Sequence, residues 1–211
     1  MEFRIEHDSM GEMKVPADRL WAAQTQRSHE NFEIGVGIET MPAEIINGFG
    51  ILKKAAAIAN NALRPEKMTE EKMNAICAAC DEVREGKLNG HFPLVVWQTG
   101  SGTQSNMNAN EVIANRANEL AGAKLCHPND DINMSQSSND TFPTAMHIAA
   151  VLETKNKLIP AVERMIAEFE RLEKENEGIV KTGRTHLQDA TPITFSQEIS
   201  GWKNMLEKSK K

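Results

Sequence analysis

The chain has 211 residues, of which 24 are Lys or Arg and 30 are Asp or Glu, so its formal net charge is −6. This acidic balance gives no field that attracts polyanions, which argues against nucleic acid and anionic membrane surfaces as partners. Hydrophobic residues make up 40% and charged residues 26%, as in ordinary globular proteins. Aromatic residues are only 5% and Tyr is absent, a composition that favours a mainly α fold.

The N-terminus carries no legible targeting signal. It contains Glu2, Glu6 and Asp8, and it lacks both the apolar stretch of a secretory signal and an Arg-rich amphipathic face. No apolar run in the chain approaches the roughly 18 residues of a membrane span. We therefore expect a cytoplasmic protein.

The first third of the chain predicts a small arm followed by helices. Residues 3–15 alternate apolar and polar side chains around a Ser-Met-Gly turn, which is typical of a hairpin or extended arm. Proline or a capping residue then opens each helical pattern. The expected helices start at Pro16, at Pro42 (ending near Arg64) and at Thr69 (ending near Gly86).

Three polar loops rich in Ser, Thr, Asn and His are predicted, at 93–108, 127–140 and 181–191. Each is expected to lead into a helix: one from about Val112 to Gly122, a long one over 141–177, and a final one with Pro192 in its first turn. Hydroxyl and amide groups at helix N-termini bind anions, above all carboxylates. Three such loops in one chain favour an anion site over ordinary caps.

The long predicted helix needs partner helices. Its apolar residues recur every seven positions, at Val151, Leu158, Met165 and Leu172. Pro160 is expected to bend or interrupt it. The amphipathic pattern of the final helix is still running at Lys211, so we expect a truncated sequence whose missing partners come from further sequence or from other subunits.

A zinc site is considered and disfavoured. Cys77 and Cys80 form a C-x-x-C, and Cys126 with His127 would complete a Cys₃His set. Neighbouring residues point in different directions, and the first pair lies inside a helical pattern. We interpret the cysteines as small apolar side chains and expect no metal.

Long sequence blocks resemble the class II fumarase family of the fumarase/aspartase superfamily. The blocks are WQTGSGTQSNMN at 97–108, HPNDDIN at 127–133, SQSSNDTFPTAMH at 135–147 and GRTHLQDATP at 183–192. The resemblance covers essentially the whole chain, but only the N-terminal part of the family's usual length. It implies a mainly α fold, with an N-terminal lyase domain at 1–136 and the start of a central helical bundle at 137–211.

The resemblance also implies the activity and its residues. The expected reaction is the reversible hydration of fumarate to (S)-malate in the tricarboxylic acid cycle, in a homotetramer without cofactor or metal. Substrate is expected to bind the matching residues Ser101, Gly102, Thr103, Ser137, Ser138, Asn139 and Thr185. His186 matches the histidine that acts on the water. A second dicarboxylate site is implied at His127, Pro128, Asn129 and Asp130, with Lys124 as a nearby positively charged residue.

These residue types suit the chemistry, because hydroxyls, amides and helix N-termini can stabilise the aci-carboxylate that forms when the C3 proton leaves. A histidine can transfer the proton of the water. The family's GSSxMPxKxN loop, which carries the serine taken as the base, has no counterpart in these residues, so we expect the 211-residue chain alone to be inactive. Two alternatives stay open: an aspartase-type ammonia-lyase, and a non-catalytic oligomerisation module.

Overall fold

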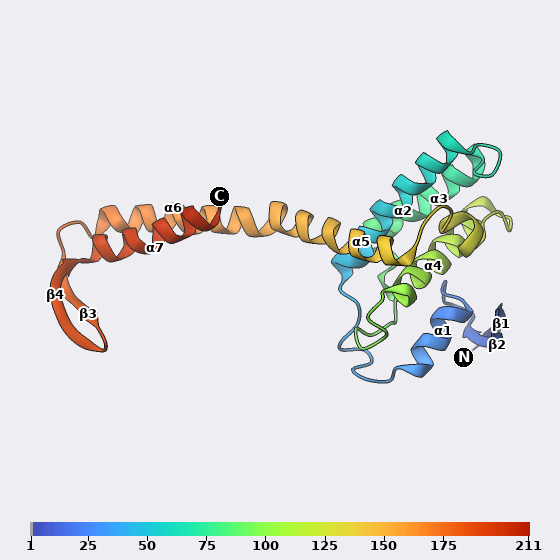
Figure 1. Cartoon of the computed structure of the whole chain (residues 1–211), viewed down its shortest axis with the longest axis horizontal. Helices are drawn as coiled ribbons and strands as arrows, with labels where there is room; N and C mark the ends of the chain where they lie inside the picture. Colours follow the sequence, from blue (N-terminus) through green and yellow to red (C-terminus); the bar gives the residue numbers. More distant parts are fainter. Residues whose placement is uncertain (1) are drawn as a thin grey trace. The chain divides into compact units, whose positions relative to one another are not determined.

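The structure, a computed structural model, describes residues 2–211 and divides the chain into two compact units, one ending at Ala150 and one spanning Val151–Lys211. The described residues form seven α-helices and two antiparallel hairpins (Figure 1), which confirms the mainly α prediction. No helix among them is long and apolar enough to cross a membrane. The predicted division at residue 136 into a lyase domain and a bundle stays a prediction.

The first unit contains two strands, most of five α-helices and two short helical turns. These are β1 (Phe3–Asp8), β2 (Gly11–Pro16), α1 (Ala23–Asn31), α2 (Ala43–Leu63), α3 (Glu70–Arg84), η1 (Asn89–His91), α4 (Thr103–Ala121), a π-helical turn η2 (Pro128–Ile132) and α5 (Ser138–Glu153). The predicted arm is confirmed as the hairpin β1–β2, in which Phe3 pairs with Pro16 and Asp8 with Gly11.

The prediction that a helix begins at Pro16 is wrong, because α1 begins at Ala23. Arg4 reaches across from β1 and donates hydrogen bonds to the carbonyl oxygens of Pro16 (2.9 Å), Arg19 (2.6 Å) and Trp21 (2.5 Å). These contacts hold the segment before Ala23 in a non-helical path. The residue that makes these contacts, Arg4, lies on β1, so the local sequence pattern around Pro16 could not reveal its effect.

The core of this unit lies between α2, α3 and α4. Phe49 from α2, Ile76 and Val83 from α3, and Ile113 from α4 are each at most 1% exposed. α2 and α3 have the predicted bounds, and the Thr69 hydroxyl accepts a hydrogen bond from the Lys72 N–H at the start of α3 (3.3 Å). Apolar side chains at helical spacing therefore pack where the sequence predicts.

Two of the predicted polar loops are shorter than expected. α4 begins at Thr103, inside the segment predicted as loop, and α5 begins at Ser138 after the helical turn η2. Gly102, with φ +76°, supplies the backbone turn that starts α4. Because small polar residues occur both in loops and in the first turns of helices, composition alone did not separate the two.

The second unit contains a π-helical turn η3 (Thr154–Leu158), α6 (Ile159–Glu175), β3 (Val180–Thr185), β4 (Gln188–Thr194) and α7 (Phe195–Ser209). The turn η3 ends at Leu158, two residues before Pro160, near which the sequence predicts an interruption. α6 and α7 lie side by side, with Lys203 paired to Glu173 and Lys210 to Glu163, both at 2.6 Å (Figure 1).

The prediction of a third polar loop at 181–191 is wrong, because residues 180–194 form a β-hairpin. Pro192 lies in β4 opposite Thr182, and α7 starts only at Phe195. Thr194 caps this helix in a capping box with Gln197. The β-branched residues of the segment were the available signal for strands, and a two-stranded hairpin has the edge positions that tolerate proline.

Candidate functional site

The first two polar segments meet at the N-termini of α4 and α5. The hydroxyl oxygens of Thr103 and Ser138 lie 3.1 Å apart, and Ser101 Oγ lies 3.4 Å from Thr103 Oγ1. Ser101 and Thr103 are exposed and Ser138 is half-buried, so their hydroxyls are accessible to a ligand. The N-terminal N–H groups of each helix lack partners within the helix, and the helix dipole favours negative charge there. The arrangement suits a carboxylate.

Ser137 and Asn139 continue this surface on the α5 side. The Asn139 N–H donates to Ser137 Oγ (3.3 Å), and the Thr141 N–H donates to the Ser137 carbonyl (2.9 Å). Below them the buried Thr141 hydroxyl donates to Asn106 Oδ1 of α4 (3.0 Å). One polar contact at the surface and one in the interior therefore join the two helix starts.

Gly102 is required where α4 packs against α5. A Cβ atom built on Gly102 would lie 2.1 Å from Cγ of Phe142, far inside van der Waals contact. Its φ of +76° is also a conformation that L-residues with a side chain adopt at a cost. The close approach of the Gly102 backbone to the Phe142 ring is therefore part of what sets Thr103 beside Ser138.

We expect Gly102→Ala to lower the free energy of unfolding by about 3 kcal/mol, through the strained φ and the overpacking against Phe142. Urea unfolding followed by circular dichroism measures this change. Gly100→Ala is the matched control, since a Cβ at Gly100 meets nothing within 4 Å. Equal unfolding midpoints for the two variants would contradict the role of this contact.

Thr185 and His186 lie in the other unit, at the end of β3 and in its turn. Thr185 pairs with Gln188, so His186 and Leu187 are the two central residues of the turn, with φ +49° and +61°. Such a turn normally uses Asn or Gly, and its strain holds a side chain at the tip. His186 is exposed and Leu187 is 97% exposed. Both side chains are thus presented to a partner or ligand.

Asp189 does not orient His186. The Asp189 carboxylate lies 3.7 Å from Nε of Arg184, its neighbour across the hairpin. The sequence alone does not show where the Asp189 side chain points. In the structure Asp189 pairs with Arg184 across the hairpin, which brings its carboxylate toward that arginine. Among the described residues no carboxylate forms an ion pair with His186.

The HPND segment forms the start of the turn η2. His127 Nδ1 accepts from the Asp130 N–H (3.3 Å), and the Asp131 carboxylate accepts from the His127 N–H (2.8 Å). Lys72 holds the other oxygen of Asp131 at 2.7 Å. The segment is therefore a hydrogen-bonded turn.

A cavity of about 440 Å³ adjoins this turn. Three of the predicted second-site residues and Lys124 line it, together with residues of β1. Its carboxylates are already partnered: Glu6 with Arg4 (2.6 Å), Asp8 with Arg27 (2.8 Å), and Glu111 with three backbone N–H groups. Lys124 has no ion-pair partner among the described residues, which leaves its charge available to an anion.

Comparison with known proteins identifies the family. A family model described as lyase matches residues 11–211. The chain belongs to this lyase family. Curated relatives named fumarate hydratase class II, from Bacillus anthracis and Campylobacter jejuni, are each 60% identical over 100% of the chain and 46% of their own length. The chain thus spans about half the length of the curated relatives it matches.

Solved structures agree with this assignment. A class II fumarase from Schistosoma mansoni superposes with a TM-score of 0.94 at 41% identity, covering 99% of this chain and 44% of that one. A fumarate lyase:delta crystallin from Brucella melitensis gives a TM-score of 0.90 at 43% identity, covering 99% of this chain and 49% of that one. The fold predicted from the resemblance, with its hairpin arm and long helices, is therefore confirmed.

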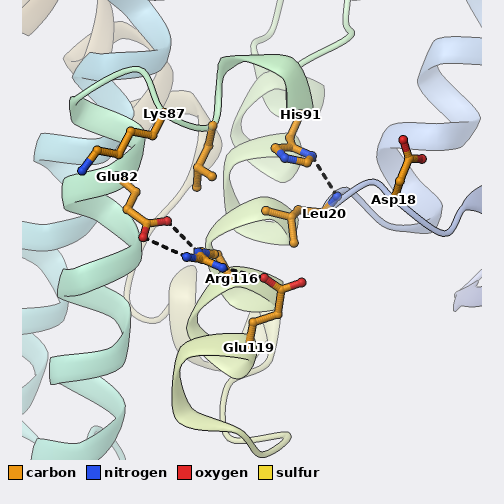
Figure 2. Close-up of a pocket in the computed structure, with 8 residues that line it drawn as sticks. Asp18, Leu20, Glu82, Lys87, His91, Arg116 and Glu119 are labelled. Carbon is orange, nitrogen blue, oxygen red and sulfur yellow. Dashed lines mark hydrogen bonds and ion pairs between the residues drawn. The ribbon is translucent and has the colours of Figure 1, made fainter.

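A second cavity, of about 430 Å³, contains none of the predicted site residues (Figure 2). Arg116 projects into it and is held by both oxygens of Glu82 (2.6 and 2.9 Å) and by Glu119 (2.8 Å). His91 Nδ1 accepts the Leu20 N–H at 3.1 Å, and burial lowers the pKa of this imidazole. With its arginine already neutralised by two carboxylates, this cavity is a poor anion site.

Two of the three cysteines, Cys80 and Cys126, are buried, and Cys126 also lines the cavity beside η2. Burial raises the pKa of Cys126 to about 11 and raises that of Cys80 still further, so both are uncharged thiols. Residues 2–211 contain no group of three or more His, Cys, Asp or Glu placed to hold a metal ion. Cys80 and Cys126 pack with the apolar core.

Proposed function

We propose that the protein carrying this chain is a class II fumarate hydratase, which interconverts fumarate and (S)-malate in the tricarboxylic acid cycle. The observation that carries the proposal is the meeting of Thr103 and Ser138, whose hydroxyls lie 3.1 Å apart at two helix N-termini. The 60% identity of relatives with that name over the whole chain supports the choice of substrate. Hydroxyl and N–H donors at two helix N-termini suit a carboxylate, and the substrate that we propose carries two.

Each predicted residue then has a role. Ser101, Gly102 and Thr103 bind one carboxylate at the start of α4, and Ser137, Ser138 and Asn139 bind it or its neighbour at the start of α5. Their N–H and O–H donors stabilise the aci-carboxylate that develops when the C3 proton leaves. The donors are uncharged groups fixed by helix ends, so we propose that neither a metal nor a cofactor takes part.

His186 and Thr185 supply the remaining roles on the turn between β3 and β4. We propose that Thr185 contacts substrate and that His186 receives the proton of the adding water or returns it to the leaving one. The strained, exposed turn supports this assignment, because strain of this kind is concentrated at functional sites. The base that removes the C3 proton is not among the residues that we assign.

The second dicarboxylate site is proposed at the cavity beside η2. His127, Pro128 and Asn129 line it with Lys124, whereas Asp130 is engaged with His127. A lysine lacks the planar fork with which arginine grips a carboxylate, so we expect weak binding there.

We further propose a cytoplasmic homotetramer without nucleic-acid or membrane partners. The second unit supports the oligomer, because large apolar side chains on its helices are exposed, including Val151 (63%), Leu158 (58%), Met165 (51%) and Met205 (60%). Such a stripe is stable in water only when other helices cover it. The net charge of −6 supports the absence of polyanionic partners.

Proton NMR of the full purified polypeptide with fumarate tests the proposal. We expect malate to appear with fumarate and no ammonia to appear with aspartate. Ammonia from aspartate would identify an aspartase-type enzyme, and an inert, correctly folded oligomer would favour the non-catalytic module. Residues 1–211 expressed alone should not form malate, since we propose that they hold only part of the site.

A further inference from the structure

Lys53 is a buried cation that the proposed reaction does not use. It lies on α2, is 1% exposed, and has no ion-pair partner among the described carboxylates. Its Nζ donates to Oδ1 of Asn133 at 3.3 Å and to Oε1 of Gln136 at 3.0 Å. Burying an ammonium without a counter-ion costs folding free energy. A residue kept at that cost suggests a function, and its hydrogen-bond partners indicate which one.

The two partners frame the turn that leads into α5. Gln136 Nε2 donates to the carbonyls of Ile132 (2.8 Å) and Met134 (3.1 Å), and Asn60 of α2 also donates to the Met134 carbonyl (3.0 Å). Ser135 within this turn has φ +60°, a strained conformation for a residue with a side chain. Side chains of the turn itself and of α2 therefore hold it in shape.

The same network reaches the start of α4. Asn133 Oδ1, besides its bond to Lys53, accepts from Asn106 Nδ2 (3.0 Å) and Asn110 Nδ2 (3.2 Å) of α4. Asn106 in turn accepts the Thr141 hydroxyl of α5 (3.0 Å). Lys53 is thus the charged member of a buried network that touches both helices of the candidate site.

We propose that Lys53 is a positioning residue for the dicarboxylate site: its ammonium holds the turn Asn133–Gln136 from below and so sets Ser137–Asn139 against Thr103. The proposal rests on the proposed function, which supplies the ligand of that site. The bonds run from Lys53 through the turn to the residues that follow it in sequence, and Asn106 carries the same constraint to α4.

The charge state of Lys53 is sensitive to an anion near it. Burial lowers the pKa of Lys53 to about 7, while Cys80 of α3, the titratable group that faces it from the packed elements, is an uncharged thiol. The groups from α4 and the turn are neutral amides. Near neutral pH the ammonium and the amine are therefore both populated, and a bound dianion favours the ammonium.

Lys53→Met in the full polypeptide tests the proposal, with Lys54→Met as the matched control. Lys54 is the next residue of α2, but it is half-buried and pairs with Asp81 at 2.6 Å. We expect Lys53→Met to raise the KM for fumarate at least tenfold and to remove a step near pH 7 from its pH profile. Amide hydrogen exchange at residues 133–139 should become at least tenfold faster, while Lys54→Met leaves both measurements unchanged.

Two results would overturn the proposal. One is a KM and pH profile equal to those of the wild type, and the other is faster exchange with an unchanged KM, which would leave Lys53 a purely structural residue. If the wild type binds succinate but does not hydrate fumarate, the proposed function is wrong while the proposal for Lys53 can still be tested. The dissociation constant for succinate then replaces KM in the comparison.

A measurement on the wild type covers the case in which Lys53→Met does not fold. NMR of isotope-labelled lysine should show one ammonium that titrates near pH 7, and Lys53 is the buried lysine of the described residues. Succinate should raise the midpoint of that titration. A midpoint unchanged by saturating succinate would overturn the proposal.

Discussion

His186→Asn in the full polypeptide is expected to lower turnover of fumarate roughly 10²- to 10⁴-fold, because it removes the group that transfers the proton of water. The substitution suits the turn, since Asn adopts the positive φ of residue 186 readily. Steady-state kinetics by malate NMR, with thermal unfolding as a check on the fold, measure the effect. KM should change less than turnover, because His186 acts on water and not on the carboxylates.

His147→Asn is the control for this experiment. His147 is exposed on α5 and has no assigned role, so its turnover should equal that of the wild type. If His186→Asn also keeps wild-type turnover, His186 is not an acid or base in the reaction, and the strained turn must serve another purpose.

Glu111→Ala is expected to lower the free energy of unfolding by about 3 kcal/mol or more. The Glu111 carboxylate on α4 is 3% exposed and accepts from the N–H groups of Ala22 (2.8 Å), Gln24 (2.9 Å) and Thr25 (3.1 Å). Removing it takes the acceptor away from three N–H donors at the start of α1, of which that of Thr25 is buried.

Urea unfolding of Glu111→Ala and of Glu119→Ala separates this effect from the general loss of a carboxylate. Glu119 lies on the same helix, but its side chain is exposed and pairs with Arg116 at 2.8 Å, a contact worth less than about 1 kcal/mol. Glu111→Gln should also be destabilised, because its NH₂ group would face N–H donors. A Glu111→Ala midpoint equal to that of Glu119→Ala would show that the start of α1 does not depend on this cap.

The sequence predicted those parts of the fold whose signals are local. The hairpin at 3–16 follows from alternation, α3 from its Thr69 cap, and the interruption before Pro160 from the ring of that residue. The start of α1 could not be predicted, because Arg4 and Glu111 act on it from β1 and α4. Long-range side chains decided the backbone where local pattern was ambiguous.

The candidate site divides in the same way. Motif blocks marked Thr103 and Ser138, but only the structure shows that their hydroxyls meet and that the bulk of Phe142 fixes the approach. Lys53 was missed, since the residue lies in an Ala-rich helix and no motif marks it. A lysine on the apolar face of an otherwise core helix was the available signal, and it became informative only once its burial was known.

The contact between Gly102 and Phe142 also limits how the two helix starts can change by mutation. Any side chain at position 102 collides with the ring, and a smaller residue at 142 opens a cavity beside an unsupported glycine. Each position is therefore at a local optimum that depends on the other. Directed evolution of this surface toward a bulkier acid would have to vary positions 102 and 142 together. A library at one position alone contains only variants in which the other residue no longer fits.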